Sequence, residues 1–217
     1  MQKRMRTPVT LLAEEGLDPM INTIIFDIGN VLVDYDHISY VRSLWEDDQI
    51  MEKVIGAIWD SGYWGELDRG EDTERIFSLM LASAPEYAEE IRLAFENVGQ
   101  CLHRTEHAIP WITKLKKRGF KVLYLSNYSE YAMQANPSVL DFLPYMDGGV
   151  FSCHAHMVKP EPGIYRKICD DYRLTPEKCV FIDDNYDNIC AAEKFGLKTI
   201  LFTGYPETKE KLELFLA

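Results

Sequence analysis

Five short apolar runs, rich in Ile, Val, Leu and Phe, constrain the fold of this chain more than any other feature of its sequence. Their apolar residues are consecutive rather than alternating, which is typical of strands buried on both faces of a parallel sheet. Stretches with helical spacing of apolar residues lie between the later runs. The predicted strands are residues 22–28, 120–125, 149–152, 179–182 and 198–202.

Helices are predicted at residues 109–118, 162–172 and 186–195. Gly119 and Gly196 follow two of them, at the position where glycine commonly ends a helix. The alternation of strands and helices indicates βαβ crossovers. We therefore expect an α/β fold, a doubly wound and mainly parallel sheet of five strands or slightly more, with helices on both faces.

Residues 38–107 interrupt this alternation. They contain four segments of helical pattern, at 38–46, 49–59, 73–84 and 87–98, without a convincing strand between them. The 217 residues exceed a typical domain of about 150 residues by an amount that fits one insert. We therefore predict an all-helical inserted domain at 38–107, a core domain at 21–37 and 108–217, and an N-terminal extension at 1–20.

The charge and composition of the chain argue against several functional classes. The chain has 35 acidic and 23 basic residues, a formal net charge of −12. Nucleic acids and anionic membranes are bound through Lys and Arg, so neither is expected as a partner. No apolar stretch approaches the roughly 20 residues of a membrane-spanning helix, and the run at 9–13 is too short for a signal peptide. Five cysteines without a C-x-x-C pair suit reduced thiols, so we expect a cytoplasmic protein.

Polar side chains stand at the ends of the predicted strands. Because the carboxyl ends of parallel strands share one edge of a sheet, residues remote in sequence should converge there. The candidates are Asp27 after the first strand, Ser126 and Asn127 after the second, Lys159 beyond the third, and Asp183 and Asp184 after the fourth.

These side chains are suited to binding and transferring a phosphoryl group. Three aspartates beside one lysine leave an excess of negative charge that a hard divalent cation, usually Mg²⁺, would compensate. The Ser126 hydroxyl, the Asn127 amide and the Lys159 ammonium can donate hydrogen bonds to a phosphate. A carboxylate facing the phosphorus can act as nucleophile, and water can then hydrolyse the aspartyl-phosphate. We expect Mg²⁺ as cofactor and a small phosphorylated metabolite as partner, and leave the oligomeric state open.

Four segments carry a family resemblance: F-D-I-G-N-V-L at 26–32, L-S-N at 125–127, V-K-P-E-P-G-I-Y at 158–165 and V-F-I-D-D-N-Y-D-N-I at 180–189. In this order they resemble the four motifs of the haloacid dehalogenase superfamily, over nearly all of residues 22–204. The helical insert is similar to the C1 cap of subfamily I. The stretch 27–36, with D-R-G-E at 68–71, looks especially like the bacterial α-D-glucose-1-phosphate phosphatase group.

The resemblance implies a role for each candidate residue. Asp27 would be the nucleophile and a metal ligand, with Asp184 as a direct metal ligand and Asp183 as its outer-shell neighbour. Ser126, Asn127 and Lys159 would bind the phosphate, and Lys159 would also take part in catalysis. The implied activity is that of a Mg²⁺-dependent phosphatase, acting through an aspartyl-phosphate on a small phosphomonoester such as an anomeric sugar 1-phosphate.

Gly29 departs from the pattern of most phosphatases in this superfamily, which carry an aspartate there as general acid and base. The resemblance implies that the backbone carbonyl at this position binds the metal, and glycine keeps that carbonyl while losing the proton donor. The relatives that the motif most resembles also carry glycine. Asn188 is a second departure, because many members have an acidic residue at its position.

Two alternative functions stay open at this point. A 2-haloacid dehalogenase would use Asp27 to attack carbon without a metal, although the two further acids would repel a carboxylate substrate. A non-catalytic module that binds a phosphorylated metabolite or a partner protein would explain Gly29. The C-H-x-H at 153–156 lacks a second half of a zinc site and is interpreted as a loop at the sheet edge. Residues 62–69 resemble the cap loop that faces the site in relatives, and contact with substrate stays open.

Overall fold

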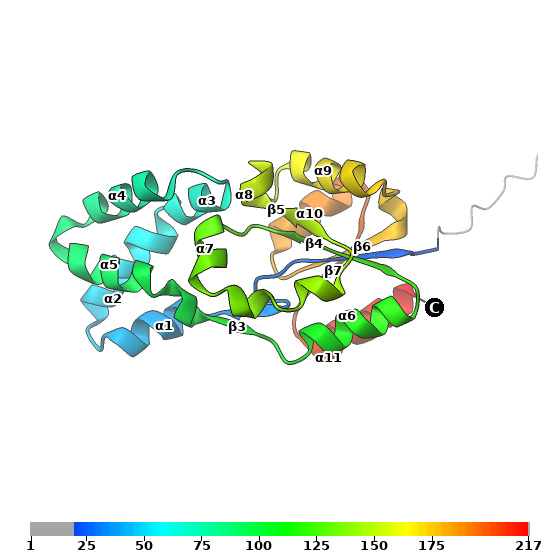
Figure 1. Cartoon of the computed structure of the whole chain (residues 1–217), viewed down its shortest axis with the longest axis horizontal. Coiled ribbons are helices and arrows are strands. Elements are labelled where there is room, and N and C mark those ends of the chain that lie inside the picture. The colour runs from blue at the N-terminus through cyan, green and yellow to red at the C-terminus, as the bar shows by residue number, and fades with distance from the viewer. Residues whose placement is uncertain (1–19, 217) are drawn as a thin grey trace, which may run out of the picture.

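The structure is a computed structural model that describes residues 20–216. Its centre is a five-stranded parallel sheet in the order β5-β4-β1-β6-β7 (Figure 1). The strands are β1 (Thr23–Phe26), β4 (Lys121–Ser126), β5 (Gly149–Phe151), β6 (Cys179–Asp183) and β7 (Lys198–Leu201). The five predicted strands and their parallel arrangement are therefore confirmed, with strand ends that differ by a few residues.

Each face of the sheet packs against its own pair of helices. Ile24 and Phe26 of β1 belong to a core cluster with buried residues of α6 (Ala108–Lys117) and α11 (Tyr205–Phe215). Ile25 belongs to a second cluster, with α9 (Pro162–Tyr172) and α10 (Tyr186–Phe195). Figure 1 shows α9 and α10 on one side of the sheet and α6 and α11 on the other. All four β1 side chains are therefore buried, which explains the uninterrupted apolar run. The doubly wound α/β prediction is confirmed.

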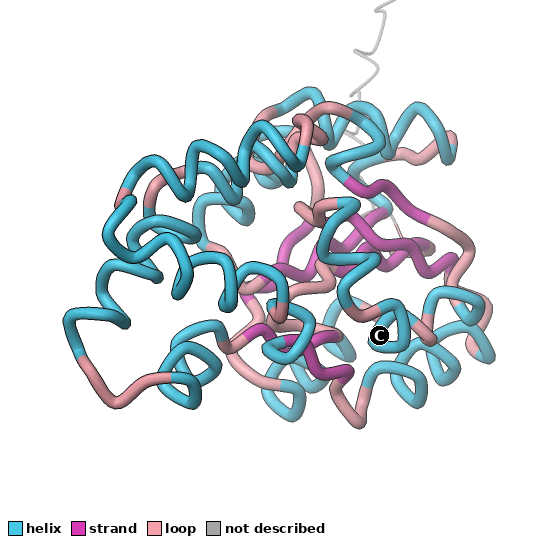
Figure 2. Tube along the Cα trace, turned by 60° about the vertical axis from the view of Figure 1, so that its left-hand side comes forward, coloured by secondary structure: helices cyan, strands magenta, loops and turns pink. Residues whose placement is uncertain are grey.

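The helical insert, residues 36–101, lies to one side of the sheet (Figure 2). Its helices are α1 (His37–Leu44), α2 (Asp48–Ile55), a π-helical turn (Gly56–Asp60), α3 (Tyr63–Asp68), α4 (Thr73–Ser83), α5 (Ala88–Glu96), and 3₁₀ turns at Pro85–Tyr87 and Val98–Cys101. Aspartates at positions 36, 47 and 72 cap three of these helices, each accepting backbone N–H groups of the first turn. The local sequence thus sets where these helices begin.

A two-stranded antiparallel ribbon connects the insert to the core. It pairs β2 (Val33–Tyr35) with β3 (Leu102–Arg104). The prediction that residues 38–107 contain no strand is therefore wrong for Leu102–Arg104. Strands of three residues are too short to show a period of two, and the ribbon exists only because segments remote in sequence meet. The interpretation of 153–156 as a loop is also wrong in part, because α8 (Ser152–Ala155) is a single helical turn.

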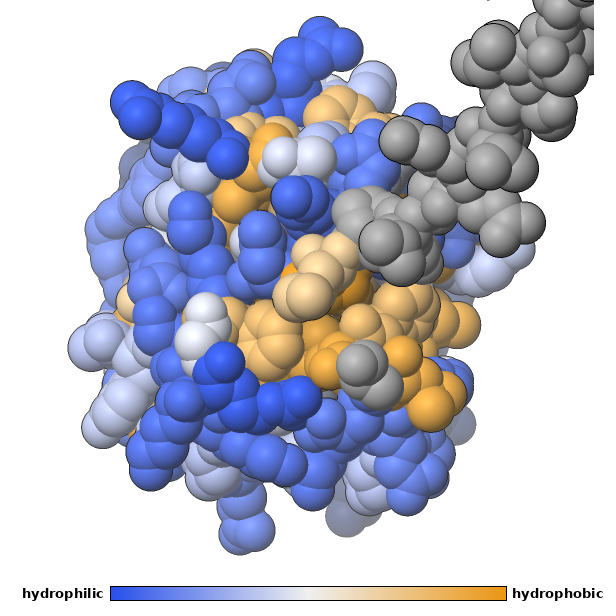
Figure 3. All heavy atoms as spheres, turned by 90° about the vertical axis from the view of Figure 1, so that its right-hand side faces the viewer, coloured by the Kyte–Doolittle hydropathy of each residue, from blue (hydrophilic) through white to orange (hydrophobic). Residues whose placement is uncertain are grey.

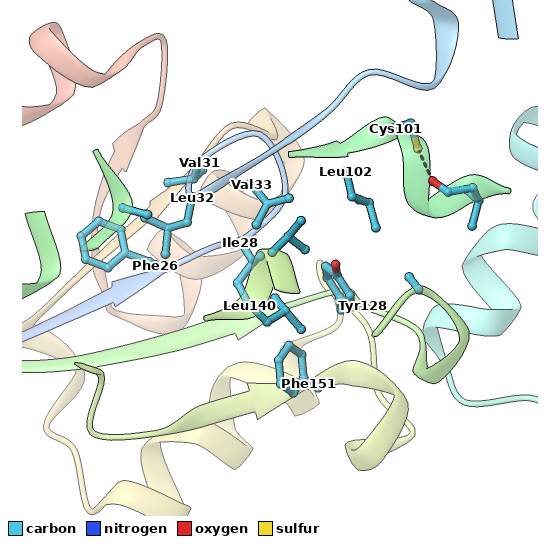
Figure 4. Packing of buried hydrophobic residues seen from close by; sticks show 14 of the residues in the cluster. Phe26, Ile28, Val31, Leu32, Val33, Cys101, Leu102, Tyr128, Leu140 and Phe151 are labelled. Carbon is cyan, nitrogen blue, oxygen red and sulfur yellow. Dashed lines mark hydrogen bonds between the residues drawn. The ribbon is translucent and has the colours of Figure 1, made fainter. Parts of the chain in front are cut away.

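The loop that follows β1 is anchored in the core. Ile28, Val31, Leu32 and Val33 are fully buried, and Figure 4 shows them near Tyr128, Leu140 and Phe151, which belong to the same cluster. The Ile28 carbonyl accepts hydrogen bonds from the N–H groups of Leu32 and Val33, both at 2.9 Å. The backbone on either side of Gly29 is therefore held by packing and by hydrogen bonds.

A hollow of about 910 Å³ lies at the amino edge of the sheet, where β1, β4 and β7 begin. Figure 3 shows apolar side chains gathered on this face; Met20 and Leu214 are 87% and 81% exposed. The candidate residues named above stand at the opposite, carboxyl edge. No helix among residues 20–216 is both long and apolar enough to cross a membrane. The predicted N-terminal extension lies outside the described residues, apart from Met20.

Candidate active site

The carboxyl ends of the three central strands bring the predicted residues together. Asp27 directly follows β1, Ser126 ends β4 and Asp183 ends β6. Phe26 is paired with Ile182 in the parallel register, and the Asp27 N–H donates to the Ile182 carbonyl at 2.8 Å. The sheet itself therefore places Asp27 beside Asp183.

Lys159 joins these two aspartates in a buried ion cluster. Its Nζ lies 2.8 Å from Asp27 Oδ1 and 2.6 Å from Asp183 Oδ2, and its side chain is only 1% exposed. Burial alone would lower the pKa of Lys159, but the two carboxylates raise it above its ordinary value. The lysine therefore carries its positive charge in the folded protein.

The first turn of α10 fixes the carboxylate of Asp183. Asn188 Nδ2 lies 3.1 Å from both carboxylate oxygens, and the Asn185 N–H donates to Oδ1 at 2.7 Å. Asn185 also caps α10 through its own side chain. Asn188, which occupies a position that is acidic in many family members, thus supplies a donor that orients Asp183 rather than a further charge.

Asp184 completes a group of three carboxylates. Ligand atoms of Asp27, Asp183 and Asp184 all lie within 4.8 Å of one another. Asn30 Nδ2 donates to Asp184 Oδ2 at 3.0 Å and so ties Asp184 to the loop after β1. Burial raises the pKa of Asp27 to about 7 against the lowering effect of Lys159, and burial also raises the pKa of Asp184. A set of hard, acceptor-only oxygens at this spacing fits a divalent cation such as Mg²⁺.

Asn127 supports Lys159. Its Oδ1 accepts the Lys159 N–H at 2.8 Å, and its Nδ2 donates to the Lys159 carbonyl at 3.0 Å. Ser126 is buried at the end of β4. The distance from its hydroxyl to the Asn127 carbonyl oxygen is 3.5 Å, which is the upper limit for a hydrogen bond. The positioning role of Asn127 was not evident from the sequence, because it depends on a backbone segment 32 residues away.

Gly29 lines a small cavity between the sheet edge and the helical insert. The cavity has a volume of about 60 Å³ and is also lined by Tyr35, Trp64, Asp68 and Asn127. A Cβ built on Gly29 meets nothing within 4 Å. Neither steric crowding nor a positive φ therefore requires glycine here, and the position leaves space where most family phosphatases would have an acid.

Asp68, at the end of α3, is the acidic residue of the insert that faces this cavity. Burial and the charge of Asp27 raise its pKa to about 7, against the lowering effects of Lys159 and the Ser129 N–H. The sequence placed residues 62–69 near the site only by resemblance and assigned no role to Asp68. A side chain that reaches the site from another part of the fold leaves no signal in strand periodicity.

The C-H-x-H segment does not converge on a common point. Cys153 is buried, and His154 Nε2 pairs with Glu130 at 2.9 Å. His156 instead contacts the carbonyl of Arg69. Glu130, Cys153 and His154 could offer three ligand atoms within 4.8 Å of one another, fewer than the four that structural zinc usually takes.

A family model described as haloacid dehalogenase-like hydrolase matches residues 21–196. The chain is 25% identical over 197 residues to drimenol cyclase of Aspergillus calidoustus, covering 89% of this chain and 36% of that protein. It therefore spans about a third of the length of this relative. It is 23% identical to a sesquiterpene phosphatase of Aspergillus oryzae (80% of this chain, 85% of that protein) and 24% identical to D-ribitol-5-phosphate phosphatase of Bacteroides thetaiotaomicron (91% and 99%).

Solved structures show the same fold. A haloacid dehalogenase family enzyme from Bacteroides thetaiotaomicron superimposes with a TM-score of 0.69 at 21% identity, over 89% of this chain and 99% of that one. A structure of the same enzyme with magnesium and inorganic phosphate gives a TM-score of 0.64 at 19% identity, over 86% and 98%.

Proposed function

The chain belongs to the haloacid dehalogenase-like hydrolases, and we propose that it is a Mg²⁺-dependent phosphatase of small phosphomonoesters. One observation carries this proposal: Lys159 pairs with both Asp27 and Asp183 and offsets one of their two charges, while carboxylate oxygens of Asp27, Asp183 and Asp184 lie within 4.8 Å of one another. A bound Mg²⁺ would offset the remaining negative charge and polarise a phosphoryl oxygen. Asp27, Asp184 and the Gly29 carbonyl would hold it, with Asp183 behind them.

Asp27 is the proposed nucleophile. Its Oδ1 accepts the Ile28 N–H at 2.7 Å and pairs with Lys159, so its orientation is fixed and Oδ2 is the oxygen available for attack on phosphorus. Lys159 and the Ser126 hydroxyl would stabilise the charge of the transferring group. Water then hydrolyses the aspartyl-phosphate and frees Asp27.

A 2-haloacid dehalogenase remains the competing hydrolase. The carboxylates of Asp183 and Asp184 would repel a haloacid carboxylate, which favours the phosphatase. Release of inorganic phosphate rather than halide distinguishes the two activities, and the absence of both would favour a binding module.

Two substrate classes are supported by different observations. The resemblance of 27–36 and 68–71, together with Gly29, favours an anomeric sugar 1-phosphate, whose leaving oxygen needs less protonation than a primary alcohol. The relative named D-ribitol-5-phosphate phosphatase accords with a small sugar-type phosphate, but the leaving group of ribitol 5-phosphate is a primary alcohol, so it does not favour the 1-position. The walls of the cavity beside Gly29 favour an apolar leaving group, because Val33, Tyr35, Trp64 and Leu102 line it. A relative named a sesquiterpene phosphatase accords with the second class.

The first experiment is a screen for phosphate release with excess Mg²⁺ or with a chelator. We expect the protein to release phosphate from at least one ester in excess Mg²⁺ and from no ester in the presence of chelator. Asp184→Ala should lose activity and also lose the Mg²⁺-induced rise in melting temperature. Asp187→Ala, which removes an exposed acid three residues later in the first turn of α10, is the matched control. An equal Mg²⁺-induced shift in wild type and Asp184→Ala would place the metal elsewhere.

A further inference from the structure

The end of α3 is attached to the core at the active edge. The Asp68 carbonyl accepts the Ser152 hydroxyl at 2.5 Å, and His156 Nδ1 lies 3.2 Å from the Arg69 carbonyl. Arg69 makes two hydrogen bonds to Glu161, at 2.7 and 3.1 Å. The Asp68 carbonyl, the Arg69 carbonyl and the Arg69 side chain of the insert therefore all contact the core segment between β5 and α9.

Gly70 permits this close approach. Its φ is +89°, and a Cβ at this position would collide with the Cys153 carbonyl oxygen. Any other residue would have to push the α3 end away from the core. The sequence D-R-G at 68–70 thus places three features at the contact: the acid Asp68, Arg69 with its ion pair to Glu161, and Gly70, which has no side chain.

This attachment places Asp68 at the cavity beside the reaction site. Asp68 lines the same cavity as Gly29 and Ser129, the residue that precedes α7 (Glu130–Ala135), and the Ser129 N–H lowers the pKa of the Asp68 carboxyl. Two titratable groups shift the pKa of Asp68: Asp27 raises it and Lys159 lowers it. The charge of Asp68 in turn raises the pKa values of Tyr35, Tyr128 and Cys153. Lys159 is the only cation among these described groups, and it is engaged by Asp27 and Asp183.

We propose that Asp68 is the proton donor to the leaving group, so that the helical insert supplies the acid that Gly29 lacks. This inference rests on the proposed phosphatase function. When Asp27 attacks phosphorus, the bond from phosphorus to the ester oxygen breaks, and the Asp68 proton moves to that oxygen. The leaving group departs as a neutral alcohol, Asp27 holds the phosphoryl group, and Asp68 becomes a carboxylate.

The second half of the reaction returns the proton. Asp68 accepts a proton from the attacking water as its oxygen bonds to phosphorus and the bond to Asp27 breaks. The products are inorganic phosphate, the Asp27 carboxylate and protonated Asp68, so the cycle closes with one water consumed. A pKa near 7, raised mainly by burial, suits a group that gives and takes a proton near neutral pH.

The test compares two esters in the isosteric variant Asp68→Asn. Use kcat/KM, which reports the steps up to release of the alcohol, for an alkyl phosphate and for the activated aryl ester 4-nitrophenyl phosphate. We expect a fall of about 10²–10⁴ for the alkyl ester and less than about tenfold for the aryl ester, whose leaving oxygen needs little protonation. Glu66→Gln, an exposed acid in the same helix, should leave both values unchanged.

The pH profile gives a second readout that a structural role would not produce. Asp27 must be deprotonated to attack and Asp68 must be protonated to donate, so kcat/KM for the alkyl ester should pass through a maximum near pH 7 and fall on the alkaline side in the wild type. This fall should be absent in Asp68→Asn. Equal losses for both esters, or an unchanged pH profile, would overturn the inference while leaving the phosphatase intact. If the wild type releases no phosphate from any ester, the proposed function fails instead.

Discussion

At the scale of single residues, the site is a buried group of three aspartates and one lysine that only the folded chain brings together. Asp27, Asp183, Asp184 and Lys159 were predicted to converge because each follows a strand of a parallel sheet, and the structure brings them together. Asp68 could not be predicted in the same way. It depends on how the insert packs against the core, and strand periodicity carries no information about that contact.

Lys159 provides a stability prediction. Replacing it by Met keeps an unbranched side chain, one atom shorter, but leaves Asp27 and Asp183 buried without their cation. Removing one partner of a buried ion pair typically costs about 3–5 kcal/mol, and we expect a loss of this size in the free energy of unfolding. Urea denaturation measures it. Lys167→Met is the control, because its pair with Asp171 is partly exposed and should contribute about 0–1 kcal/mol.

Comparing the losses in Lys159→Met and Lys167→Met shows whether the buried ion cluster stabilises the fold more than a surface ion pair does. Mg²⁺ should restore part of the stability of Lys159→Met, since a cation at the three carboxylates reduces their repulsion. Equal, small losses in both variants would show that the buried cluster contributes no more than a surface pair.

At the scale of elements, the sequence predicted what is periodic and local. The five strands and helices α6, α9 and α10 were found because each buries a continuous or helical stripe. Helix α11, of 11 residues, was not predicted. The ribbon β2–β3 and the short helices α3, α7 and α8 were not predicted either, since three to six residues are too few to show a period. These short pieces form the contact between insert and core, where long-range packing decides the structure.

The ion pair between α3 and α9 tests whether that contact serves the reaction. Both side chains of Arg69 and Glu161 are partly exposed, so Glu161→Gln should change the free energy of unfolding by less than about 1 kcal/mol. Weaker docking should still lower kcat/KM by about two- to fivefold, because fewer molecules hold Asp68 at the site. Arg75→Gln breaks a comparable pair with Glu71 inside the insert and should leave kcat/KM unchanged. Equal kinetics in the two variants would contradict a docking role.

At the scale of the whole molecule, the insert covers the reactive edge of the sheet. The cavity at Gly29 holds about 60 Å³, room for one or two waters but not for a sugar or a terpenoid. We propose that the insert moves as a cap over the core, admitting substrate when open and excluding water when closed. The net charge of −12 is compatible with phosphate binding if the buried Lys159, together with the proposed Mg²⁺, sets the local field at the site.

The proposed reaction requires the phosphoryl group to pass through Asp27. Rapid acid quenching during turnover, followed by borohydride trapping and peptide mass spectrometry, identifies the residue that carries it. We predict trapping at Asp27 in the wild type and none in Asp27→Asn, which should also lose turnover while keeping its fold. Trapping at another residue, or turnover of Asp27→Asn within tenfold of the wild type, would contradict the account.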